Sequence, residues 1–90
     1  MNLSGKRVLI CGVANQRSLA WAIAQACHDA GAELAFTYLN ERMEGSVRKL
    51  GDKIGVSQYF ELDVCNDDHF DSLAQGIKDS WGTLDHVVHS

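Results

Sequence analysis

The sequence predicts an α/β fold, in which a parallel sheet is covered by helices on both faces. Short runs of apolar and β-branched residues alternate along the chain with segments whose apolar residues recur every three or four positions. Glycines separate these segments, since the chain contains 8 Gly and no Pro. Strands that alternate with helices predict parallel pairing through right-handed crossovers. A chain of 90 residues has room for one such domain, which we assign to residues 1–90.

The first unit is a buried strand followed by a helix. Arg7–Cys11 is a short apolar run (RVLIC) closed by Gly12, which is typical of a strand inside a parallel sheet. Residues 18–30 are predicted to be helical, and Gly31 stands where the end of a helix favours a left-handed residue. The apolar stripe expected on this helix consists of Leu19, Ile23 and Cys27.

The second unit repeats this arrangement. Glu33–Tyr38 (ELAFTY) is the second predicted strand, and Asn40 can cap the helix that follows it. We expect this helix to end at Gly55. Its buried face is predicted to carry Met43, Val47, Leu50 and Ile54.

The third unit leads into a fourth strand. Residues 58–62 form the third predicted strand, Asn66 or Asp67 can cap the third helix, and Gly82 closes it. The apolar face of this helix is expected to carry Phe70, Leu73, Ile77 and Trp81. Residues 85–90 are the fourth strand, and the strand order expected for a doubly wound sheet is 3-2-1-4. An antiparallel sheet is disfavoured because no two strands are separated by a short hairpin turn.

The loop after the first strand is the segment most informative about function. Gly12 lets the backbone turn sharply from strand to helix, and the small Ala14 leaves room for a pyrophosphate near the free N–H groups of the helix. Ser18 supplies a hydroxyl at the start of that helix, either as a cap or as a donor to phosphate. The loop lacks the second and third glycines of the usual dinucleotide fingerprint, so its position in the fold carries the prediction.

Several segments together resemble the bacterial enoyl-acyl-carrier-protein reductases, a divergent branch of the short-chain dehydrogenase/reductases. They are residues 3–7 (LSGKR), 12–14 (GVA), 18–20 (SLA), 22–24 (AIA), 31–38 (GAELAFTY), 63–64 (DV) and 89–90 (HS). The serine at position 18, in place of the last glycine, is similar to the pattern of this branch. The resemblance extends along the whole chain in order, and it implies the N-terminal part of a Rossmann-type domain.

The resemblance implies a cofactor-binding role for eight residues. Gly12 and Ala14 would lie close under the pyrophosphate, and Asp63 would accept a hydrogen bond from the adenine amino group. All of the residues follow the carboxyl ends of predicted strands, where open α/β sheets bind ligands. The set is Gly12, Ala14, Ser18, Leu19, Leu39, Asp63, Val64 and Ser90. Considered without the resemblance, Asp63 would be a solvated carboxylate that caps a turn.

The cofactor implied is NADH, with NADPH less favoured. The family often has a polar or basic residue after the second strand, whereas Leu39 stands there and can only pack against the adenosine. Glu41 and Arg42 follow, and they would act in opposite directions on a 2′-phosphate.

The activity implied is NADH-dependent reduction of an enoyl thioester double bond in fatty-acid synthesis, with an enoyl-acyl-carrier-protein as substrate. The resemblance also implies a homo-oligomer, a homotetramer in the intact enzyme. The family's catalytic tyrosine and lysine are expected beyond Ser90, so no catalytic residue is assigned, and Tyr38 and Tyr59 lie on the wrong elements. The fragment alone is therefore predicted to be inactive.

Alternative functions remain open from the residues alone. They are another short-chain dehydrogenase/reductase, or a non-catalytic nucleotide-binding module similar to receiver or flavodoxin domains. A receiver needs acidic residues after both the first and third strands, and only Asp63 meets this requirement, since Gly12 follows the first strand. A P-loop is excluded because no Gly-Lys-Ser/Thr motif occurs.

Composition disfavours several other classes. The net charge of −4 and the absence of a basic run argue against nucleic-acid binding. No segment is apolar for long enough to be a membrane span or a signal peptide, so a cytoplasmic location is expected. The 3 Cys include no C-x-x-C pair, which predicts reduced thiols. No metal site is expected, because His86 and His89 would point to opposite faces of a strand.

Overall fold

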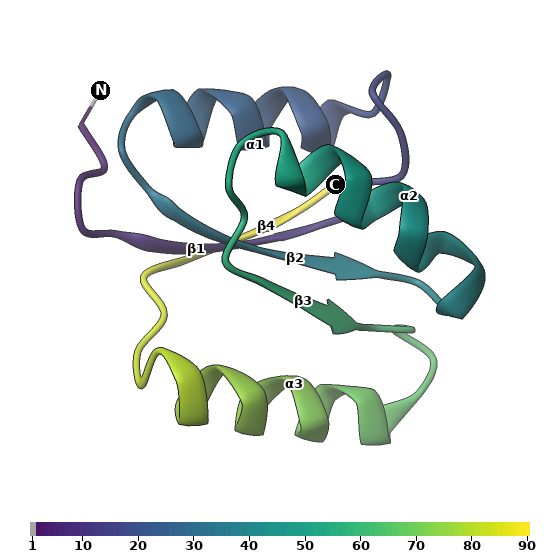
Figure 1. The fold of residues 1–90 in the computed structure, drawn as a ribbon. Helices are drawn as coiled ribbons and strands as arrows, with labels where there is room; N and C mark the ends of the chain where they lie inside the picture. The colour runs from purple at the N-terminus through teal and green to yellow at the C-terminus, as the bar shows by residue number, and fades with distance from the viewer. Residues whose placement is uncertain (1) are drawn as a thin grey trace.

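The computed structural model describes residues 2–90 as a four-stranded parallel sheet with helices on both faces (Figure 1). The order along the chain is β1 (Arg7–Cys11), α1 (Leu19–Asp29), β2 (Glu33–Tyr38), α2 (Glu41–Asp52), β3 (Gln58–Glu61), α3 (Asp67–Ser80) and β4 (His86–His89). The strands lie in the order β3-β2-β1-β4, and every pair is parallel. The predicted fold class and strand order are confirmed.

Two apolar clusters hold the layers together, one on each face of the sheet. Helices α1 and α2 cover one face and α3 covers the other (Figure 1). Alternate residues of β1 serve the two sides, since Val8 and Ile10 belong to the first cluster and Leu9 and Cys11 to the second. Phe36 is fully buried in the first cluster, where its ring meets the rings of Trp21 and Tyr59 edge to face.

The helix boundaries follow from side-chain caps that the sequence predicts. The side chains of Ser18, Asn40 and Asn66 accept hydrogen bonds from backbone N–H groups in the first turns of α1, α2 and α3. Asn66, and not Asp67, is the cap of α3. Gly31, after α1, has a φ of +95°, the left-handed conformation expected of a residue that ends a helix.

Three expectations about the helices are wrong. The Leu19 side chain is 66% exposed, because α1 places the small Ala20 and Ala24 on the sheet and leaves Leu19 beyond the strand ends. The Phe70 side chain is 45% exposed, although Leu73 and Ile77 of the same stripe are buried. Helix α2 ends at Asp52 instead of Gly55, since its final turn tightens into hydrogen bonds between residues three apart.

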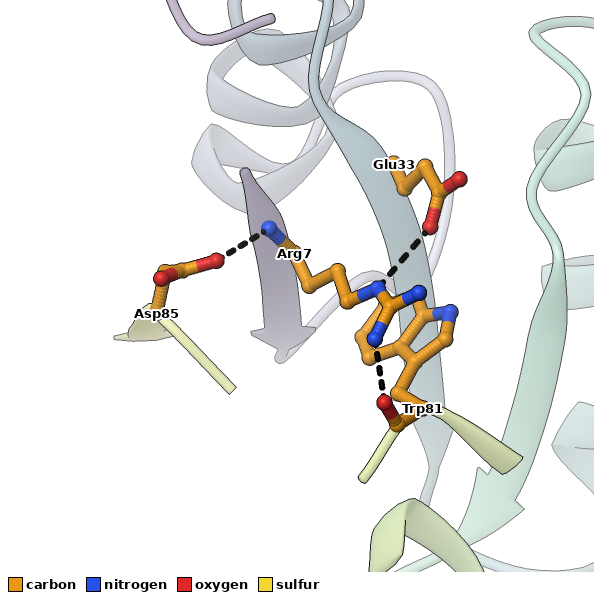
Figure 2. A network of polar contacts seen from close by, with 4 residues as sticks. All are labelled: Arg7, Glu33, Trp81 and Asp85. Atoms are coloured by element: carbon orange, nitrogen blue, oxygen red, sulfur yellow. Dashed lines mark hydrogen bonds and ion pairs between the residues drawn. The ribbon is translucent and has the colours of Figure 1, made fainter. Parts of the chain in front are cut away.

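The amino edge of the sheet is held by Arg7, which joins four elements (Figure 2). Its guanidinium forms an ion pair with Glu33 of β2, with 3.2 Å between Nε and Oε2, and donates to the carbonyl oxygen of Trp81 after α3. The guanidinium also lies 5.9 Å from the centroid of the Trp81 ring. The backbone N–H of Arg7 donates to the carboxylate of Asp85 before β4, at 2.8 Å. These contacts tie the amino ends of β1 and β2 to the segment between α3 and β4.

Candidate functional site: a groove at the carboxyl edge of the sheet

Because the strands are parallel, their carboxyl ends all lie along one edge of the sheet, opposite the edge where β1 begins (Figure 1). A groove with a volume of about 230 Å³ lies there. Four predicted residues line it: Gly12, Ala14, Leu39 and Val64. These residues come from the segments that follow β1, β2 and β3, which are far apart in the sequence. The parallel order of the strands is what places them around one groove.

At Gly12 the backbone of the segment after β1 lies very close to the backbone of Ser90. The φ of Gly12 is +97°, a conformation that other residues rarely adopt, and a Cβ atom built on it would lie 1.8 Å from the carbonyl oxygen of Ser90. The Ser90 N–H donates to the carbonyl oxygen of Cys11 at 3.3 Å, which continues the pairing of β1 with β4. Only glycine therefore fits at position 12, where the backbones of β1 and Ser90 approach each other.

The start of α1 faces the same edge. The Ser18 hydroxyl donates to the carbonyl oxygen of Asn15 at 2.8 Å and accepts from the N–H of Trp21 at 3.3 Å. The hydroxyl therefore acts as the helix cap, and its own proton is used within the loop. The backbone N–H groups of the first turn have no partner inside the helix and carry the positive end of its dipole. In this loop the anion-binding capacity lies in the backbone.

Asp63 is held by three hydrogen bonds just beyond β3. Its N–H donates to Nδ1 of His69 at 2.9 Å, its Oδ1 accepts from the N–H of Cys65 at 2.9 Å, and its carbonyl oxygen accepts from Asn66. The second carboxylate oxygen forms no hydrogen bond within the described residues. The Asp63 carboxylate therefore caps the turn through Oδ1, and its other oxygen is available as an acceptor. The next residue, Val64, is 57% exposed and lines the groove.

Four of the predicted residues lie outside the groove lining. Ser18 and Leu19 lie at the start of α1, Asp63 lies behind Val64, and Ser90 contacts Gly12 through its backbone. All four remain at the carboxyl edge that the prediction specified. Ser18, Asp63 and Ser90 form hydrogen bonds within the loops around the groove, whereas the lining residues form its walls.

The groove has lining residues that the sequence analysis missed. They are Cys11, Val13, Thr37, Met43, Leu62 and His89. Thr37 is the omission that the sequence could have revealed, because it is a polar residue near the end of an apolar strand. In the structure its side chain is buried. Burial raises the pKa of the neighbouring Cys11 thiol, and a hydrogen bond with Thr37 lowers it by less. Cys11 is therefore protonated at neutral pH and serves as part of the wall.

The histidines of β4 lie apart, as expected. His86 lines an apolar groove beside α1, and His89 lines both an apolar groove on the α3 side and the groove at the carboxyl edge. Within residues 2–90 no group of three or more His, Cys, Asp or Glu side chains is arranged to hold a metal ion. Among the same residues, no helix has the length and apolar character needed to cross a bilayer.

The fold and the groove are those of a Rossmann-type α/β domain, a class in which ligands bind at the carboxyl ends of the parallel strands. Comparison with known families specifies it further. The family model described as enoyl-(acyl carrier protein) reductase matches residues 12–90. The chain belongs to this family.

Individual relatives agree with this assignment. The enoyl-acyl-carrier-protein reductase (NADH) FabI of Rickettsia bellii is 44% identical over 97% of this chain and 33% of its own length. The crystal structure of the Aquifex aeolicus enoyl-acyl-carrier-protein reductase (NADH) superposes with a TM-score of 0.94 at 42% identity, covering 97% of this chain and 34% of that one. The crystal structure of the Anaplasma phagocytophilum reductase in complex with NAD superposes with a TM-score of 0.91 at 40% sequence identity. The match covers 94% of this chain and 32% of that one. The chain thus spans about a third of the length of the curated relatives it matches.

Proposed function

We propose that residues 1–90 form the cofactor-binding part of an NADH-dependent enoyl-acyl-carrier-protein reductase. The observation that carries the proposal is the groove itself. Gly12, Ala14, Leu39 and Val64 converge there from three separate loops, beside the N-terminus of α1. Family membership and the NAD complex of the Anaplasma reductase support the same cofactor.

The lining of the groove supports a dinucleotide as its ligand. Gly12, which the contact with Ser90 keeps free of a side chain, would let a pyrophosphate approach the backbone closely. The first N–H groups of α1, from Leu19 onward, would hold the phosphate oxygens. The exposed side chains of Leu39 and Val64 provide apolar walls for the adenine ring, and the free oxygen of Asp63 would accept from its amino group.

In the proposed reaction this chain binds and orients the cofactor, and the bound NADH supplies the hydride that reduces the enoyl double bond. The groove holds the adenosine and pyrophosphate, so the nicotinamide would extend past Leu19 at the start of α1. The Leu19 side chain is 66% exposed, which leaves it free to pack against that end of the cofactor. These residues act by position, and no proton transfer is assigned to any of them.

The preference for NADH over NADPH follows from the end of β2. Leu39 is 52% exposed and offers a 2′-phosphate no hydrogen bond. Glu41 and Arg42 begin α2, where both side chains are exposed. We expect Glu41 to repel the 2′-phosphate and thereby offset the attraction of Arg42.

The test is direct binding of NADH, measured by fluorescence titration, with NADPH as the comparison ligand and Mg²⁺ with acetyl phosphate as the probe for a receiver-type domain. Saturable NADH binding, tighter than NADPH binding, is the expected result. Turnover is measured in a chimera in which residues 1–90 replace the matching segment of the Aquifex aeolicus reductase. A chimera that folds and binds crotonyl thioester but fails to bind NADH would contradict the proposal.

The same proposal extends to the whole protein. We propose an enoyl thioester carried by acyl carrier protein as its substrate, a homotetramer as its assembly and the cytoplasm as its location. The family assignment supports these statements. Sedimentation of the chimera and its activity on enoyl thioesters of acyl carrier protein test assembly and substrate.

A further inference from the structure

We infer that His69 is a positioning residue for the adenine end of the cofactor, acting through the backbone of Asp63. The inference rests on the proposed function and adds a residue that contributes no lining to the groove. His69 lies in the first turn of α3, and Asp63 lies in the loop between β3 and α3. The two residues are joined by the hydrogen bond from the Asp63 N–H to Nδ1 of His69.

The hydrogen bond specifies the state of the imidazole ring. Nδ1 accepts, so it carries no proton, and in the neutral ring the proton lies on Nε2. Nε2 lies 3.8 Å from Oε1 of Glu61, the last residue of β3. The ring therefore lies between the strand and the loop, and it connects both to the start of α3. The His69 side chain is 24% exposed, so most of it is held in place by its surroundings.

The effect on the groove passes through Asp63 and Val64. The other two hydrogen bonds of Asp63 run forward along the loop, to Cys65 and Asn66. The bond to His69 is the one that ties the Asp63 N–H to a side chain in α3. Without it, the loop would lose a fixed point at the residue that precedes Val64, and a partly buried N–H would lack its acceptor. The adenine wall and the free carboxylate oxygen would both lose their fixed position.

Two substitutions at position 69 separate positioning from general stability. His69→Leu removes the acceptor, while His69→Asn places an amide oxygen, which is also an acceptor, where Nδ1 lies. We expect His69→Leu to weaken NADH binding about fivefold to tenfold, as loss of one partly buried hydrogen bond predicts, and His69→Asn to stay within about twofold of the wild type. The control is His28→Leu, in the last turn of α1, which should leave affinity unchanged.

Ligand fragments locate the effect. AMP carries only the adenosine end, and nicotinamide mononucleotide carries only the other end. His69→Leu should weaken AMP binding and leave nicotinamide mononucleotide unaffected, a pattern that general destabilisation would not produce. In the chimera with the Aquifex aeolicus reductase, KM for NADH should rise while kcat is retained.

The outcomes distinguish the two proposals. If the wild-type chain binds no NADH, the proposed function fails, and this inference fails with it. If the wild type binds NADH and His69→Leu binds it and AMP equally well, only the inference is overturned. A ¹⁵N spectrum of the imidazole gives an independent check, since it should show a protonated Nε2 and an unprotonated Nδ1 near neutral pH. A protonated Nδ1 in that spectrum would also overturn the inference.

Discussion

A Cβ atom on Gly12 would lie 1.8 Å from the carbonyl oxygen of Ser90, so the ends of β1 and β4 approach too closely for any side chain at this position. The contact joins residues that are distant in the sequence, and both were predicted to contact the cofactor. It makes the glycine a requirement of the sheet as well as of the groove. Two effects of a substitution here, strain and loss of binding, can be measured separately.

Gly12→Ala should destabilise the fold and abolish NADH binding. The matched control is Gly5→Ala, because Gly5 also has a positive φ, of +78°, but a Cβ there meets no atom within 4 Å. The control should cost about 1 kcal/mol from backbone conformation alone, and Gly12→Ala should cost more. Thermal unfolding and NADH titration of both variants provide the measurement. Equal losses of stability would show that the Ser90 contact relaxes without penalty.

Ser18→Ala should lower stability by about 1 kcal/mol, because α1 loses its cap. It should also weaken NADH binding, since the Ser18 hydroxyl holds the loop through the carbonyl oxygen of Asn15. Asn40→Ala removes a similar cap from α2, outside the proposed pyrophosphate site, and should reduce stability alone. If the two variants bind NADH equally well, the role of Ser18 is limited to the cap.

Stability should fall as the pH rises into the alkaline range. Burial raises the folded-state pKa of Cys11 above its ordinary value of 9.0, and burial together with the Asp52 hydrogen bond raises that of Tyr59 above 10.0. A group with a raised pKa holds its proton more tightly when folded, so its contribution is present below the ordinary value and is lost above it. Tyr59→Phe should make the alkaline decline shallower in thermal unfolding. An unchanged decline in that variant would contradict the assignment to Tyr59.

The 90-residue chain should self-associate through β4. This strand is at the edge of the sheet, Val87 is 59% exposed, and apolar grooves lie on both of its faces. Neither Lys nor Pro interrupts the strand, so its free edge can pair with a second copy. Val87→Lys should shift light scattering toward monomer, while Gln25→Lys on the exposed side of α1 should not. A wild-type monomer that melts at the same temperature at all concentrations would refute this prediction.

Residues 1–90 alone should bind NADH without reducing an enoyl thioester. The groove contains the contacts expected for the cofactor, and its one thiol, Cys11, has a pKa raised by burial. Absorbance of NADH in the presence of crotonyl thioester is the measurement, with the chimera as the positive control. Turnover above the buffer rate by the chain alone would show that a proton donor among these residues was overlooked.

The sequence by itself determined the order and type of every element in the described chain. Apolar spacing, Ser18, Asn40 and the glycines are local signals, because caps and turns depend on neighbouring residues. Parallel pairing also followed, since strands separated by helices have few other arrangements. The carboxyl edge was therefore predictable as the place of the proposed site, and the family resemblance pointed to four of its lining residues.

Only the tertiary structure decided which side chains face inward and what joins the loops. Leu19 and Phe70 fit an apolar helical stripe, yet both are exposed, because the orientation of a helix is set by the surface it packs on. Thr37 entered the groove wall through its position in β2. The bond from Asp63 to His69 and the contact of Gly12 with Ser90 depend on distances between separate elements. Such distances are set by packing, which a linear pattern of residues does not encode.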